Sequence, residues 1–160
     1  CQTDKRKVWV VDEIALRNAT TMEMAVEVLK RYGNHTAGFI VYGSAVGTIK
    51  ASTGKSDYAI LKDMGFNRQA VKITNPPDAD RINAANNMLE DLSGAVRLTY
   101  HPQCTFLRKD FDQAMWTEDM TDIDRTDFGR GNASDSLGYF IHAEFQMRMH
   151  KPNAAKRFYK

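Results

Sequence analysis

The sequence has little of what marks several large protein classes. Two cysteines, Cys1 and Cys104, occur in 160 residues, which is too few for a disulfide framework or a cysteine-based metal knuckle. The four histidines show no ligand spacing, so a zinc site is not expected. No apolar run approaches the length of a membrane span, and no signal-peptide pattern is present. We therefore expect no contact with a membrane, and we expect a reducing compartment.

The overall charge gives no sign of a strongly charged partner. Net charge is only +2, so no global field indicates nucleic acid or a membrane surface. Hydrophobic residues make up 42% and charged residues 26%, which is ordinary for a globular domain. We expect one domain over 1–150, followed by a basic C-terminal tail over 151–160. The chain opens on Cys1-Gln2 without an initiator Met, so we expect it to be part of a longer protein.

Short apolar strands alternate with segments of helical spacing, which indicates an α/β fold. The first helix carries a capping box, in which Thr20 and Glu23 satisfy each other's backbone donors. Met22, Val26 and Leu29 recur at helical spacing, so we expect them to form the buried face of that helix. The pattern predicts strands over 7–11, 39–42, 69–73 and 96–99, and helices over 20–33, 57–64, 78–94, 102–115 and 132–145.

The apolar run Phe39–Tyr42 is the expected centre of the sheet. It is short and rich in β-branched and aromatic residues, which is typical of a strand buried on both faces. The run ends at Gly43, and Ser44 follows directly. Sites in open α/β sheets lie outside the carboxyl ends of the strands, so Ser44 occupies a candidate site position.

Carboxylates occur at two further places where a site could form. Asp12 and Glu13 follow the first predicted strand, and Asp135 lies in the first turn of the last helix. Oxygen ligands of this kind suit Mg²⁺ or Mn²⁺, and two such ions can assist phosphodiester cleavage. A simpler interpretation remains for each. The strand-end acids are solvated charges, and Asp135 completes a capping box with Asn132 as N-cap.

Six segments match a known family in the order in which they occur. They read Val-Trp-Val-Val-Asp-Glu-Ile (8–14), Tyr-Gly-Ser-Ala-Val-Gly (42–47), Ser-Asp-Tyr-Ala-Ile-Leu (56–61), Asp-Arg-Ile-Asn-Ala-Ala-Asn (80–86), Pro-Gln-Cys (102–104) and Ala-Ser-Asp-Ser-Leu-Gly-Tyr (133–139). Together they resemble the C-terminal nuclease domain of the large terminase subunit of tailed phages. The resemblance covers most of the chain. It implies a ribonuclease H-like mixed sheet flanked by helices, here with its N-terminal strand or strands truncated or missing.

The resemblance also implies a function. Members of that family are endonucleases that cut concatemeric viral DNA during genome packaging, with Mg²⁺ or Mn²⁺ as cofactor. The expected partners are double-stranded DNA, the ATPase motor domain of the same parent protein, the small terminase subunit and the portal. The expected location is the cytoplasm of the bacterial host. Asp135 is then a catalytic metal ligand, and Lys50, Lys55 and Arg81 are candidate DNA contacts.

Several positions depart from the family pattern. Ser44 stands where the family has the Asp of Tyr-x-Asp-x-x-Gly, and Asn132 stands where a His is common. The family's first acid lies on a strand upstream of Val8, where this chain has only a few residues. Asp12 and Glu13 are the nearest substitutes. We therefore expect impaired cleavage. The alternatives are a catalytically dead DNA-binding or assembly module, such as a prophage remnant, and a small α/β domain with no role on nucleic acid.

Overall fold

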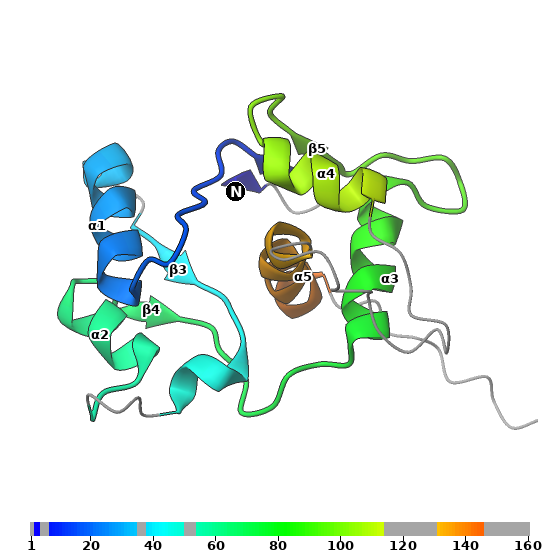
Figure 1. Cartoon of the computed structure of the whole chain (residues 1–160). Coiled ribbons are helices and arrows are strands. Elements are labelled where there is room, and N and C mark those ends of the chain that lie inside the picture. Colours follow the sequence, from blue (N-terminus) through cyan, green and yellow to red (C-terminus); the bar gives the residue numbers. More distant parts are fainter. Residues whose placement is uncertain (1, 4–6, 35–37, 50–53, 114–130, 146–160) are drawn as a thin grey trace, which may run out of the picture.

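The computed structural model describes residues 2–3, 7–34, 38–49, 54–113 and 131–145, and these form a mixed α/β fold with short parallel strands (Figure 1). The predicted tail over 151–160 lies outside the described residues. The strands are β1 (Gln2–Thr3), β2 (Val8–Val10), β3 (Ile40–Val41), β4 (Arg68–Gln69) and β5 (Leu98–Tyr100). The helices are α1 (Thr21–Tyr32), the 3₁₀ turn η1 (Ala45–Thr48), α2 (Asp57–Asp63), α3 (Asp78–Leu89), α4 (Thr105–Gln113) and α5 (Asn132–Glu144).

The main core forms around the parallel pair β2 and β5, with β1 antiparallel at the outer side of β2. Val8 and Val10 are buried, whereas Trp9 between them is 39% exposed. This alternation is the period of a strand with one covered face. Helices α3, α4 and α5 supply the rest of this core, and α5 packs against both of the others. Its buried members are Val8, Val10, Ala84, Ala85, Met88, Leu98, Cys104, Leu107, Leu137 and Ile141.

The strand predicted to be central is instead part of a second, smaller group. Among the described residues, β3 pairs only with β4, in parallel, and these two strands lie with α1 and α2 beside the main core (Figure 1). Ile40 is 41% exposed, so the expectation of burial on both faces is wrong. An apolar run of this length does not reveal how many strands pair with it. Here Phe39 packs on the buried Phe66, which leaves the outer face of β3 in solvent.

Helix α1 begins as the sequence predicts and buries a different face. The Glu23 amide donates to Thr20 Oγ1 at 3.2 Å, and the Thr20 amide donates to Glu23 Oε2 at 2.7 Å. The buried residue of this helix is Ala25. Met22 and Val26 are more than half exposed, so the predicted buried stripe is wrong. The small group offers little apolar surface to pack against, and helical spacing alone does not report that.

The start of α5 is held by a buried carboxylate from α4. Asp110 is 4% exposed and accepts hydrogen bonds at 2.9 Å from the amides of Gly131, Ala133 and Ser134. Gly131 is the N-cap residue and has φ +85, a backbone conformation that favours glycine. The proposed capping box between Asn132 and Asp135 is therefore wrong, because the helix starts at Asn132 and Asp110 satisfies its free amides.

We expect Asp110→Ala to destabilise the fold strongly. The change leaves three amides at the start of α5 without their acceptor, at a cost of about 3 kcal/mol in the free energy of unfolding. Asp112→Ala is the matched control, because Asp112 lies on the same helix and is exposed. Urea unfolding measures both variants. Equal losses for the two would contradict the capping role of Asp110.

Candidate functional site

Asp12, at the end of β2, is bound by side chains from α1. Its Oδ2 accepts from the Tyr32 hydroxyl at 2.6 Å and from Arg31 Nη1 at 2.9 Å. Gln103 reaches its Oδ1 at 3.4 Å. The hydrogen bonds from Tyr32 and Arg31 hold the pKa of this carboxyl below its ordinary value of 3.8. Asp12 therefore fastens α1 to the end of the main sheet as a stable carboxylate.

Glu13, the next residue, caps helix α4. Its two carboxylate oxygens accept from the amides of Phe106 at 2.8 Å and Leu107 at 3.0 Å. These amides belong to the first turn of α4, where a negative charge also meets the positive end of the helix dipole. Asp12 and Glu13, the two predicted catalytic acids after β2, thus have structural partners in α1 and α4. None of the hydrogen bonds described for them involves Asp135.

Asp135 in the first turn of α5 is paired with a buried arginine. Arg81 Nη1 donates to Asp135 Oδ1 at 2.9 Å, and Arg81 Nη2 donates to Asp78. The Arg81 guanidinium also lies over the Tyr139 ring, 4.5 Å from its centroid. Gly138 of α5 lies against the same residue, since an added Cβ would meet Arg81 Cβ at 3.4 Å, an ordinary van der Waals distance.

Arg81 is only 3% exposed, which does not suit the DNA contact expected of it. Among the described residues, no acceptor is found for its buried Nε. Arg81 points into the interior of the fold, where the carboxylates of Asp78 and Asp135 receive it. Of the other predicted DNA contacts, Lys55 is exposed and pairs with Asp63 at 2.6 Å, and Lys50 lies outside the described residues.

Ser44, at the end of β3, caps the turn η1. Its Oγ accepts from the Val46 amide at 3.2 Å and from Asn75 Nδ2 at 3.0 Å. Asn75 Oδ1 in turn accepts from the Ala45 amide at 2.6 Å. The Tyr58 hydroxyl donates to the Ser44 carbonyl at 2.8 Å. The Ser44 hydroxyl also donates to Asn75 Oδ1 at 3.2 Å. Ser44 is thus a well-bound turn residue that caps η1 as an acceptor.

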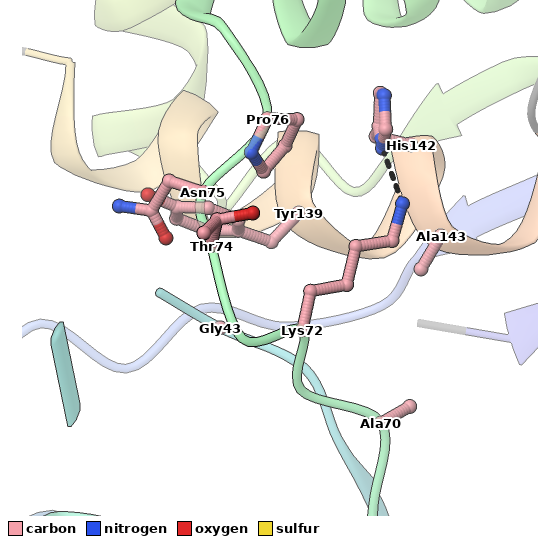
Figure 2. A pocket seen from close by; sticks show the side chains of 9 residues that line it. All are labelled: Gly43, Ala70, Lys72, Thr74, Asn75, Pro76, Tyr139, His142 and Ala143. Carbon is pink, nitrogen blue, oxygen red and sulfur yellow. Dashed lines mark hydrogen bonds between the residues drawn. The ribbon is translucent and has the colours of Figure 1, made fainter. Parts of the chain in front are cut away.

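The end of β3 meets the middle of α5. The Tyr42 ring packs edge-on against Phe140 at a centroid distance of 5.1 Å, and its hydroxyl donates to Glu144 at 2.7 Å. Burial, helped by that hydrogen bond, raises the pKa of Tyr42 to about 12, so it remains a neutral donor. Gly43 and Tyr139 line one small hollow, together with Asn75 (Figure 2). The strand end that carries Ser44 and the helix that carries Asp135 are therefore neighbours.

The acids themselves are divided between two places. Asp12 and Glu13 contact α1 and α4, whereas Asp135 contacts Arg81 of α3. In the described part of the chain, no group of three or more His, Cys, Asp or Glu side chains could hold a metal ion. The single carboxylate that the resemblance assigns to the metal already faces an arginine cation.

Two residues of this region were not predicted from the sequence. Lys72 follows β4 and His142 lies on α5, and both line the hollow beside Gly43. A signal for His142 was present, because positions 135, 139 and 142 share one face of a helix. Lys72 could have been found only with the pairing of β3 and β4 in hand, since that pairing brings both strand ends to the same edge.

Comparisons with known proteins add no relative. No family model matches the chain, and no match is found among curated proteins or solved structures. In the part of the chain that the structure describes, no helix is both long enough and apolar enough to cross a bilayer.

We expect Tyr32→Phe to flatten the acid dependence of stability. The lowered pKa of Asp12 in the folded state stabilises the protein at pH values above the ordinary 3.8. That contribution is lost as the pH falls through the folded-state pKa, so removal of the Tyr32 hydroxyl should shrink the loss. Urea unfolding at neutral pH and at several acidic pH values measures the slope.

Tyr58→Phe is the control for this prediction. This change also deletes a hydrogen bond from a tyrosine hydroxyl, but the acceptor of that bond is the Ser44 carbonyl, which does not titrate. Its stability should fall by a similar amount at every pH. An unchanged acid slope in Tyr32→Phe, or an equal change in both variants, would refute the role assigned to Asp12.

Proposed function

We propose that this chain is a metal-dependent endonuclease domain of the type that cuts concatemeric DNA during phage genome packaging, present here in an impaired form. The supporting observation is that the end of β3 meets α5. The hollow lined by Gly43 and Tyr139 joins the strand end with Ser44 to the helix with Asp135. These are the two elements from which the terminase resemblance draws metal ligands. The order of motifs and this contact therefore both favour a site between the end of β3 and α5.

The finer fold proposed is ribonuclease H-like. Its support is the parallel pairing of β2 with β5 and of β3 with β4, with helices beside both pairs. Parallel strands place their carboxyl ends at one edge, where such a site would form. The ATPase motor domain, small terminase subunit, portal and host cytoplasm belong to this proposal through the resemblance alone.

The residues present do not suit a tightly bound Mg²⁺ or Mn²⁺. Such ions need several oxygen ligands with negative charge. Ser44 offers a neutral hydroxyl that already accepts two hydrogen bonds, and Asp135 is neutralised by Arg81. No cleavage step through a metal ion follows from these residues. A carboxylate at position 44 would supply the missing charge.

The second candidate function is a DNA-binding or assembly module that kept the fold and lost cleavage. The structural use of Asp12, Glu13 and Asp135 favours it, since each carboxylate stabilises an ion pair or a helix start. The two candidate functions predict different results when Ser44 is replaced by a carboxylate. A nuclease-type site should then bind a divalent cation, and a module without such a site should not.

We expect Ser44→Asp to create a response to Mn²⁺. An aspartate can accept the same hydrogen bonds from Val46 and Asn75, so the turn should form. Without metal, the aspartate cannot make the hydrogen bond that the Ser44 hydroxyl donates to Asn75 Oδ1, so the melting temperature should fall relative to the parent. Added Mn²⁺ should reverse that loss, by about 2.7 kcal/mol when its concentration is a hundredfold above the dissociation constant.

Melting curves in chelator and in Mn²⁺ test this, with Ser56→Asp as the matched control. Ser56 is the N-cap of α2, so an aspartate there adds the same charge at a tolerated position outside the site. If Ser44→Asp and Ser56→Asp respond alike to Mn²⁺, the nuclease-type site is wrong. Cleavage of plasmid DNA is not expected from Ser44→Asp alone, because Asp135 is still neutralised by Arg81.

We also expect the parent chain to bind duplex DNA weakly and without sequence preference. Attraction to phosphate depends on counterion release, so affinity should fall steeply as salt rises. Fluorescence anisotropy with two unrelated duplexes over a salt series measures this. Sequence-specific binding that survives high salt contradicts the prediction, and the absence of any binding at low salt favours a domain with no role on nucleic acid.

A further inference from the structure

The hollow between β3 and α5 is positively charged and is not used by the proposed metal ligands. It is bounded by Gly43 at the end of β3, by the segment after β4, and by α5 (Figure 2). Lys72 extends from the segment after β4 towards His142 on α5, and its Nζ lies 3.4 Å from His142 Nδ1. Thr74 and Asn75 add a hydroxyl and an amide beside them.

The described ionisable groups that line this hollow include no acid. Lys72, His142 and Tyr139 contribute them, and among the described lining residues no carboxylate is present. A Lys beside a His with no acid between them is repulsive whenever the imidazole is protonated. Lys72 is exposed and His142 is half-buried, and an anion that accepts from both would relieve that repulsion.

The surroundings of His142 keep its imidazole neutral when the hollow holds no anion. Burial, followed by the charge of Lys72, lowers the pKa of His142 below its ordinary 6.5. From α3, Asp80 acts in the opposite direction and Arg81 in the same direction as Lys72. A neutral His142 can accept a hydrogen bond from Lys72, and protonation turns it into a second donor.

The size of the hollow limits what can enter. Its enclosed part has a volume of about 10 Å³, which is close to the space of one water-sized atom. One oxygen of a larger group fits this space, while the rest of the group stays at the open side. A tetrahedral oxyanion meets both conditions, since it offers a protruding oxygen and a negative charge.

We propose that Lys72 and His142 bind one phosphate group of a DNA backbone. This rests on the proposed function, which supplies DNA as the source of the phosphate. Lys72 acts as a cationic donor, and protonated His142 donates from its ring nitrogen. The phosphate is thereby placed beside Gly43 and the Ser44 strand end, so the site orients a strand at the position from which the metal ligands are drawn.

Binding at this site is pH-dependent. A phosphate favours the protonated imidazole, so it raises the pKa of His142, and its affinity increases as the pH falls from about 7.5 to about 5.5. The pH effect therefore depends on His142, and the affinity that remains at neutral pH depends mainly on Lys72.

Inorganic phosphate is the first probe, because it needs no DNA. NMR titration of the histidine side chains of the whole chain should show a raised pKa for His142 in millimolar phosphate. Lys72→Gln should abolish that rise, whereas Lys109→Gln should not, because Lys109 is an exposed lysine on α4. No phosphate-dependent change at His142 overturns the site. A change that Lys72→Gln leaves intact overturns the pairing.

Duplex DNA is the second probe. Lys72→Gln should weaken binding to all sequences alike and reduce the slope of log affinity against log salt by about 1, as loss of one phosphate contact does. His142→Gln should remove the gain in affinity at acidic pH, while His101→Gln should retain it, because His101 is an exposed histidine outside the hollow.

The two probes separate failure of this site from failure of the proposed function. If DNA binds and Lys72→Gln leaves both affinity and salt slope unchanged, the phosphate site is wrong and the proposed function stands. If inorganic phosphate perturbs His142 but DNA neither binds nor displaces it, the DNA source is wrong. The response of Ser44→Asp to Mn²⁺ involves neither Lys72 nor His142, and it tests the proposed function by itself.

Discussion

The buried carboxylate of Asp110 is the constraint on which the rest of the structure depends. Helix α5 packs on both α3 and α4, and it carries Tyr139 and His142 towards the end of β3 and Asp135 towards Arg81 of α3. A helix in that position has its first amides buried, and buried donors need an acceptor. Asp110 supplies it from α4, so the start of α5 is fixed by another element of the fold. The positions of the candidate site residues on α5 therefore depend on these three hydrogen bonds.

The acids of this chain illustrate why a carboxylate at a strand end is a weak indicator of catalysis. Asp12 joins the main sheet to α1, Glu13 caps α4, and Asp135 faces a buried arginine. In each case the negative charge of the carboxylate is balanced by a nearby cation or by hydrogen-bond donors, so no metal ion is needed to balance it. Arg81 between Asp78 and Asp135 shows the same behaviour, because the buried guanidinium neutralises both carboxylates.

Local features of the fold could be predicted from the sequence, and long-range ones could not. The capping box of Thr20 and Glu23, the strand around Val8 and the start of α2 all depend on residues close together in sequence. The partnership of Asp110 with α5 spans more than twenty residues, and that of Arg81 with Asp135 more than fifty. Periodicity also cannot tell a strand with one neighbour from one with two, which is why β3 was placed at the centre. The hollow was missed because Lys72 and His142 come from different elements.

The buried residues are unevenly distributed, so two parts of the molecule differ in local stability. The main core contains nearly all of the buried apolar side chains, whereas the group of α1, α2, β3 and β4 buries Ala25 and Phe66. Such a group opens at a lower free energy than the core does, as a separate cooperative unit. The hollow spans the two parts, since Gly43 belongs to the small group and His142 to α5. An anion bound there would connect them, and occupancy of the site would then govern how tightly the small group is closed onto the rest of the protein.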